Sequence, residues 1–281
     1  MKTVVLSMDI EDWYHLDYFN GLKCDKTYSM LDGINTYLEI LSLHNIQSTF
    51  FVVSEIAESI SHTLKEIINE KHEISSHGSN HIRPASIPLS SFSNDLYNSK
   101  RTLEEIIGKN IEGYRAPCFS INRQQLDIVQ QAGYTYDSSR IDFDSHPLYE
   151  TINMNGYELI CPNIYRNKNF FEFQVTTNTF FGKNIPISGG GYLRILPWVI
   201  SKMLINPYLS HGELYILYIH PFELSLKENP PFPSKTRWHN QLRFGIGRRN
   251  VQKKLSKLIK LLKNNGYTFQ TFSSLKSLLT Q

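Results

Sequence analysis

Short apolar runs alternate with amphipathic segments along the first half of the chain. The apolar runs predict buried strands at residues 3–8, 48–53, 73–76, 113–115 and 134–136. Apolar side chains at helical spacing predict helices between them, at residues 33–44, 55–71, 90–107 and 124–132. Such a strand-then-helix order is typical of an α/β protein with a parallel sheet, either open or closed into a barrel.

The second half of the chain is less regular. We expect loops and short strands over residues 138–212, a strand at 213–219 and a long loop at 229–243. Residues 249–264 predict a basic helix, followed by a last strand at 267–271 and a last helix at 273–279. Because the sequence has no clear domain boundary, internal repeat or low-complexity segment, we expect residues 1–281 to form one domain.

Reactive side chains stand at the ends of the predicted strands. These residues are Asp9, His77, Arg115, Asp137 and His220. In folds with parallel strands, the chemistry gathers at the carboxyl ends of the strands. Packing alone would not place a reactive group at five strand ends, so the pattern predicts a functional site at this edge.

Three carboxylates follow the first predicted strand. Asp9, Glu11 and Asp12 lie within four residues of one another, and their mutual repulsion is costly unless a cation or an arginine is near. A metal ion together with Arg115 would relieve this repulsion, one carboxylate binding the metal and another accepting a proton from water. The simpler alternative is an ordinary acidic loop.

Two histidines four residues apart follow the third predicted strand. On a helical turn, the spacing of His77 and His81 would put both rings on one side, with Cβ atoms about 5–6 Å apart. Two histidines and one carboxylate leave positions open on a divalent ion, as catalytic metal sites require. The histidine pair alone is equally compatible with a structural role.

Composition narrows the class of protein. Hydrophobic residues make up 41% of the chain and charged residues 20%, as in ordinary soluble proteins, and the net charge of +3 gives no argument for nucleic-acid binding. The cysteines Cys24, Cys118 and Cys161 form no CxxC pair, which favours a reducing compartment. The first residues do not resemble a secretory signal, and no apolar run reaches about 18 residues, so we expect a cytoplasmic location.

Some features have both a structural and a functional interpretation. Trp13 and Tyr192 are predicted to contact the substrate, although core packing is an alternative for Trp13. His146, before a proline, is a weaker candidate for the site. The basic helix at 249–264 has an apolar stripe, which favours an outer barrel helix with a solvated basic face over weak association with a membrane surface.

Five segments of the sequence occur in an order that resembles a known family. They are S-M-D-I-E-D-W-Y-H, S-H-G-S-N-H, G-Y-R-A-P-C-F-S, Y-D-S-S and L-Y-I-H-P-F-E-L. Together they resemble the five motifs of the polysaccharide deacetylase family, carbohydrate esterase family 4. G-G-G-Y-L-R is similar to the branch found in bacterial exopolysaccharide and surface-glycan loci. The resemblance implies a distorted (β/α) barrel of about seven parallel strands and a divalent metal, most often zinc.

The resemblance also implies roles for five residues. Asp9 resembles the catalytic base, and Arg115 resembles the arginine that orients it through a charge-assisted hydrogen bond. The backbone N–H of Cys118 falls where the family builds part of its oxyanion hole. His220 resembles the general acid that protonates the leaving amine, and Asp137 resembles the acid that tunes this histidine.

The metal ligands implied by the resemblance include one open choice. His77 and His81 resemble the two metal-binding histidines. The common family form has two adjacent aspartates, whereas this chain has D-I-E-D, so the metal carboxylate is Glu11 or Asp12. We favour Glu11, and the other acid then bonds groups around the ligands.

The resemblance implies metal-dependent hydrolysis of an N-acetyl or other N-acyl group from an amino sugar in a bacterial surface-glycan pathway. With a cytoplasmic location, the substrate is expected to be a nucleotide-linked or lipid-linked acylamino sugar. One alternative is a C–N hydrolase of a non-sugar amide on the same fold. Another is a catalytically inactive glycan-binding protein, since a fold alone does not determine a function.

Overall fold

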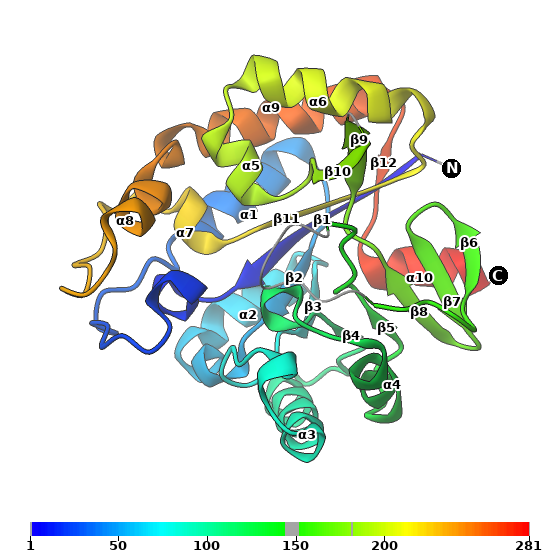
Figure 1. Cartoon of the computed structure of the whole chain (residues 1–281), viewed down its shortest axis with the longest axis horizontal. Coiled ribbons are helices and arrows are strands. Elements are labelled where there is room, and N and C mark those ends of the chain that lie inside the picture. The colour runs from blue at the N-terminus through cyan, green and yellow to red at the C-terminus, as the bar shows by residue number, and fades with distance from the viewer. Residues whose placement is uncertain (1, 144–151, 181, 281) are drawn as a thin grey trace.

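The centre of the protein is a sheet of parallel strands built around β1 (Thr3–Ile10), as Figure 1 shows. The computed structural model describes residues 2–143, 152–180 and 182–280, so His146 lies outside the described residues. The strand order is β11-β1-β2-β3-β4-β5-β8, and every neighbouring pair in it is parallel. These seven strands agree with the predicted α/β architecture. The bounds of the others are Thr49–Val52 for β2, Glu73–Ser76 for β3, Gly113–Tyr114 for β4, Tyr136–Asp137 for β5, Phe170–Phe173 for β8 and Leu214–Ile219 for β11.

Irregular segments join the two ends of this row of strands. After β8, the Val175 N–H donates to the Arg140 carbonyl at 2.8 Å. The Ile187 N–H then donates to the Thr176 carbonyl, and the Tyr218 N–H on β11 donates to the Ser188 carbonyl at 3.1 Å. These bonds bring the two edges of the sheet together, as a distorted barrel requires.

Smaller antiparallel elements extend the sheet. The hairpin of β6 (Glu158–Cys161) and β7 (Ile164–Asn167) pairs with β8, and β9 (Thr177–Phe180) pairs with β10 (Lys183–Pro186) as a separate ribbon. The short β12 (Thr268–Phe269) lies parallel to the first residues of β1. The single large sheet therefore draws strands from both halves of the chain.

Helices cover the outside of the parallel strands. Every residue of β1 is buried, because helices pack outside the sheet and side chains fill the space inside it. The outer helices described here are α1 (Gly33–His44), α2 (Ser61–Asn69), α3 (Leu89–Ile107), α4 (Arg123–Gln131), α6 (Trp198–His211), α9 (Val251–Asn264) and α10 (Phe272–Thr280).

Three helices were wrongly predicted as loops. The segment 138–212 contains α5 (Gly190–Ile195) and α6, and the segment 229–243 contains most of α8 (Trp238–Gly245). In α6, Pro207 interrupts the sequence pattern, and Val199 and Met203 are exposed, so no clear apolar face marks this helix. The glycine run at the start of α5 prevented its prediction, because glycine has a low helix propensity. The predicted helix at 55–71 also begins later, since two 3₁₀ turns precede α2.

The apolar stripe of the basic helix α9 faces the barrel. Val251, Leu255, Leu258 and Leu262 are all fully buried, whereas Lys257 is exposed. The interpretation of this segment as an outer helix with a solvated basic face is therefore confirmed. In the described part of the chain, no helix is long and apolar enough to cross a membrane.

We expect Leu258→Ala to lower the free energy of unfolding by about 2–5 kcal/mol, because it removes a fully buried side chain and leaves a cavity. The neighbouring Lys257→Ala is the matched control and should change it by less than about 0.5 kcal/mol. Urea denaturation measures both. Equal effects of the two substitutions would show that α9 does not pack as described.

Candidate active site

One cavity collects the side chains at the carboxyl ends of the parallel strands. Its volume is about 530 Å³, and its walls come from β1, from the segments after β3, β4 and β11, and from α5 and α8. Seven residues singled out from the sequence line it: Asp9, Glu11, His77, His81, Cys118, Tyr192 and His220.

A buried ion pair lies at the floor of this cavity. Arg115 Nη1 is 2.7 Å from Asp9 Oδ1, and both side chains are nearly or wholly inaccessible to solvent. The guanidinium also donates to the Ser7 hydroxyl and to the Ser138 carbonyl and hydroxyl. Its plane lies 4.1 Å from the centre of the Phe51 ring. Because every side of Arg115 is occupied, the Asp9 carboxylate is held in one orientation.

Glu11, His77 and His81 form a cluster whose ligand atoms all lie within 4.8 Å of one another. The helical turn predicted for the two histidines is wrong. They lie in the loop after β3, and the positive φ angles of Gly78 (78°) and His81 (53°) fold this loop so that both rings turn to the same side. Their ring centres are 5.1 Å apart, which preserves the chelating arrangement by another route.

The electrostatics of this cluster suit a divalent cation. Burial lowers the pKa of His77 to about 4, so the ring is neutral at pH 7, and its Nδ1 bonds the Arg115 carbonyl at 2.8 Å, which leaves Nε2 free as a ligand. Burial would raise the pKa of Glu11, but His81, His220 and His77 lower it to about 2.

An unsatisfied oxygen completes this fit. Glu11 Oε2 is buried and accepts no well-formed hydrogen bond within the described residues, although it lies 2.6 Å from His81 Nε2. Binding of one cation by both atoms would satisfy this oxygen and replace their direct contact.

Asp12 has a different task from Glu11. Its Oδ1 accepts the backbone N–H groups of Trp13, at 2.8 Å, and Met30, at 2.9 Å. It caps the 3₁₀ turn Trp13–His15 and is not among the clustered ligands. Of the two acids left open by the sequence, the geometry therefore favours Glu11 as the metal carboxylate.

His220 stands across the cavity and pairs with an acid that sequence reasoning missed. It follows β11, and Glu223 lies one turn later on the short helix α7 (Pro221–Leu224). His220 Nδ1 is 3.4 Å from Glu223 Oε2, and Arg194 Nε is 3.2 Å from Glu223 Oε1. Burial would lower the pKa of His220, but Glu223, Glu11 and Asp9 raise it to about 9. The signal for Glu223 was present in H-P-F-E, since a spacing of three on a helical turn brings two side chains together.

The role predicted for Asp137 is not supported. Its carboxylate accepts the N–H and hydroxyl of Ser139, and it is coupled to Glu172, whereas the acid beside His220 is Glu223. Burial raises the pKa of Asp137 to about 6. Ser139 in turn accepts the Ala116 N–H, so Asp137 supports the loop that follows Arg115. Asp137 ends β5, and the register of that strand turns it toward this loop rather than toward β11.

Cys118 lines the cavity through its backbone. It has a left-handed conformation (φ 56°, ψ 21°), and its N–H has no acceptor among the described residues. Burial raises the pKa of its thiol, which disfavours a nucleophilic role. An unused N–H beside a cluster of ligands is what an oxyanion hole requires.

Of the two residues predicted to contact the substrate, one lies in the core and the other at the cavity. Trp13 is fully buried, donates to the Tyr28 carbonyl and packs on Phe19, so the prediction that it stacks on a sugar is wrong. Tyr192 on α5 lines the cavity and is partly exposed there. The difference arises because the first turn after β1 is directed inward by the Asp12 cap.

Comparison with known families identifies the first half of the chain. The polysaccharide deacetylase model matches residues 23–136, which contain the histidine pair, Arg115 and Cys118. This segment of the chain is similar to the polysaccharide deacetylase family. A domain of unknown function, DUF3473, matches residues 146–276 and covers His220 and Glu223. The cavity is thus built from both matched segments.

Two relatives and two solved structures are similar to this chain. A peptidoglycan deacetylase of Helicobacter pylori is 26% identical over 117 residues, covering 42% of this chain and 40% of that protein. A peptidoglycan-N-acetylglucosamine deacetylase of Bacillus cereus is 30% identical over 97 residues, covering 34% of this chain and 35% of that protein. The matches therefore span less than half of either relative.

The structural matches establish the fold. A candidate polysaccharide deacetylase of Mycobacterium smegmatis has a TM-score of 0.63 at 17% identity, over 99% of this chain and 90% of that one. A carbohydrate esterase family 4 pseudoenzyme of Bacillus anthracis has a TM-score of 0.56 at 13% identity, over 98% and 66%. At these identities the likeness concerns the fold alone, and activity must be argued from the site.

We expect the purified protein to bind about one divalent ion per chain. His77→Ala and Glu11→Gln should lose that ion, because each removes a member of the cluster. Asp12→Asn should keep it, since Asp12 serves as a cap, and His62→Ala is a control on an exposed histidine. Elemental analysis measures the content. Loss of the ion in Asp12→Asn but not in Glu11→Gln would reverse the assignment.

Proposed function

We propose that this protein hydrolyses the N-acetyl or other N-acyl group of an amino sugar in a bacterial surface-glycan pathway, with a divalent metal ion, most often zinc in such sites. The observation that carries the proposal is the arrangement within one cavity. The ligand cluster of Glu11, His77 and His81 lies between the Asp9–Arg115 pair and the His220–Glu223 pair.

The two flanking pairs supply a base and an acid. Asp9, fixed by Arg115, takes a proton from the attacking water, and the oxygen adds to the acyl carbon. The oxyanion that forms accepts the Cys118 N–H. His220, kept protonated by Glu223, gives its proton to the leaving nitrogen as the C–N bond breaks. The products are a carboxylate and the free amine.

The ligand cluster has the donor set for the metal. Glu11, His77 and His81 would hold the ion and leave positions open for substrate and water. When bound, a divalent ion supplies Lewis-acid activation of the acyl carbonyl and of water. Arg115 also supports the ligand cluster, because its backbone carbonyl orients His77.

The substrate class and the cellular compartment are proposed from the relatives and from the cysteines. The peptidoglycan deacetylases among the relatives act on acetylated glycans, which favours an acylamino sugar, nucleotide-linked or lipid-linked, as the substrate class. All three cysteines are free thiols, which supports a reducing, cytoplasmic compartment, to be tested by cell fractionation. Because the cavity joins both matched segments, we propose that residues 1–281 act as one catalytic domain.

We expect the protein loaded with metal to release acetate from acetamido sugars and not to open the ring of small cyclic amides. Asp9→Asn should lower kcat by about 10²-fold or more, because it removes the base. The exposed Asp25→Asn is the matched control. Turnover of cyclic amides alone would indicate a non-sugar C–N hydrolase. Sugar binding without metal or product would indicate an inactive glycan-binding protein.

The pH dependence of kcat/KM tests the His220–Glu223 pair. The raised pKa of His220 means that its acid form persists below about pH 9 and is lost as the pH rises through that value. Glu223→Gln removes a charge that raises this pKa, so we expect the alkaline limb to move to lower pH. Glu228→Gln, at an exposed acid, should leave the limb in place. An unmoved limb in Glu223→Gln would show that Glu223 does not act through His220.

A further inference from the structure

Exposed apolar side chains gather on one part of the surface. Of thirteen large apolar side chains that are exposed in the described part of the chain, eight lie between residues 195 and 246, which is under a fifth of the sequence. Scattered single exposures are normal in soluble proteins, but a concentration of this kind marks an interaction surface.

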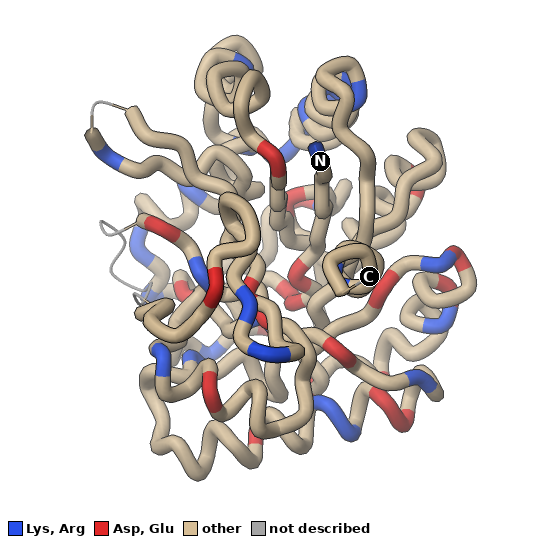
Figure 2. Tube along the Cα trace, turned by 90° about the vertical axis from the view of Figure 1, so that its right-hand side faces the viewer, with Lys and Arg blue, Asp and Glu red and all other residues tan. Residues whose placement is uncertain are grey.

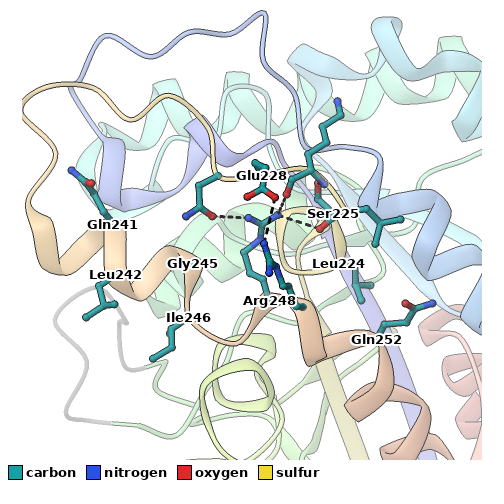
Figure 3. Close-up of a pocket in the computed structure, with 13 residues that line it drawn as sticks. Leu224, Ser225, Glu228, Gln241, Leu242, Gly245, Ile246, Arg248 and Gln252 are labelled. Atoms are coloured by element: carbon teal, nitrogen blue, oxygen red, sulfur yellow. Dashed lines mark hydrogen bonds and ion pairs between the residues drawn. The ribbon is translucent and has the colours of Figure 1, made fainter.

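The exposed side chains form two stripes. Trp238, Leu242 and Ile246 follow one another at intervals of four along and just after α8, with exposures of 75%, 58% and 44%. Such spacing places side chains on one side of a helix, and Figure 3 shows Leu242 and Ile246 projecting on the same side of α8, away from Gln241. The opposite side of α8 is anchored by the buried Phe244, which packs on Phe222.

The second stripe begins where α5 ends. Ile195 closes α5, and after an extended break at Leu196 and Pro197, Val199 and Met203 lie four residues apart on α6. The exposures of Ile195, Val199 and Met203 are 40%, 75% and 58%. We call the six side chains of the two stripes the apolar rim: Ile195, Val199, Met203, Trp238, Leu242 and Ile246.

A buried arginine ties the two stripes together. Arg194 Nη1 donates to the carbonyls of Arg243, Phe244 and Ile246, which fixes the end of α5 against α8. In Figure 1, α5, α8 and the beginning of α6 lie on the left side of the molecule. The active-site cavity opens between the stripes, because Ile195 from α5 and Arg243 from α8 both line it.

Positive charge predominates around the apolar rim, with the exposed Glu228, beside Leu242 and Ile246, as an exception. Residues 229–281 contain eleven lysines and arginines and no aspartate or glutamate. Arg237, Arg243, Arg249 and Lys202 are exposed on or beside the two stripes. By contrast, both signs of charge are mixed along the elements nearest the viewer in Figure 2, which shows the right-hand side of Figure 1. Apolar side chains surrounded by cations complement the anionic headgroups and acyl boundary of a membrane.

A pocket beside α8 does not provide an alternative ligand site. It has a volume of about 500 Å³ and lies against Arg248, as Figure 3 shows. The guanidinium of Arg248 is already bonded to Asn229 and to the carbonyls of Phe222, Ser225 and Lys227. With its donors used within the fold, this arginine stabilises the base of α8 and leaves the apolar rim as the unpartnered feature.

We propose that the apolar rim docks on an anionic phospholipid bilayer, with the mouth of the active-site cavity next to the headgroups. The buried stripe of α9 takes no part in insertion, and α9 contributes only its outward cations. Docking would bring a lipid-linked glycan to the cavity at the membrane surface. Vesicle binding itself does not rest on the proposed deacetylation, so each can fail without the other.

Sedimentation with vesicles tests the docking. We expect the protein loaded with metal to bind vesicles of phosphatidylglycerol and phosphatidylcholine at low salt and to be released at about 0.5 M NaCl. Vesicles of phosphatidylcholine alone should bind it weakly. Val199→Ser combined with Leu242→Ser should weaken binding about tenfold or more, because two apolar anchors are lost. Leu43→Ser, at a side chain 77% exposed on α1, is the matched control.

Fluorescence and mass measurements complete the test. Trp13 is buried, but Trp198 is partly exposed at the start of α6, so the emission is measured in a Trp198→Phe background. On binding, Trp238 should shift its emission to the blue, and Trp238→Phe added to that background should remove the shift. No binding at low salt, equal binding to both vesicle types or unchanged binding by the double variant would overturn the proposal. A dimer in sedimentation velocity that the double variant dissociates would assign the rim to a second copy of this chain instead, and would also overturn it.

Discussion

The burial of the Asp9–Arg115 ion pair is the constraint on which the rest of the site depends. A buried charge is tolerated only when its partner and its remaining hydrogen bonds are all present. Arg115 meets this condition by bonding Ser7 on β1 and Ser138 after β5, so one guanidinium joins strands from both sides of the sheet centre. Its carbonyl also fixes His77. The base, the ligand cluster and the order of the strands are therefore parts of one network.

The same rule explains the acid side of the cavity. His220 carries charge in a nearly closed site because Glu223 lies beside it, and Glu223 is tolerated because Arg194 pairs with it. Arg194 then binds the carbonyls at the end of α8. Gly190 belongs to this arrangement, because a Cβ at that position would lie 1.9 Å from a Glu223 oxygen. The glycine run thus leaves room for the acid that supports His220.

This second network links catalysis to the outer surface. The region matched by DUF3473 supplies α5 and α8, which contribute to the wall of the cavity. The contacts that hold Glu223 also hold α8 in place, with Phe244 inward and Trp238 outward. A partner that contacts the surface of α8 would therefore lie close to the His220–Glu223 pair in the cavity. The apolar rim is therefore connected, through these contacts, to the residues that we propose to protonate the leaving amine.

By itself, the sequence determined six of the seven parallel strands, the edge at which the chemistry gathers and seven of the residues that line the cavity. These follow from local patterns: buried strands read as apolar runs, and reactive residues such as His77 and His220 come directly after them. Only the tertiary structure decided which acid belongs to the ligand cluster and which acid pairs with His220. Asp12 accepts backbone N–H groups as a cap, which leaves Glu11 in the ligand cluster. Glu223, and not Asp137, is the acid beside His220. The sequence alone decided neither result, because strand register and the direction of each side chain are set by packing between distant segments.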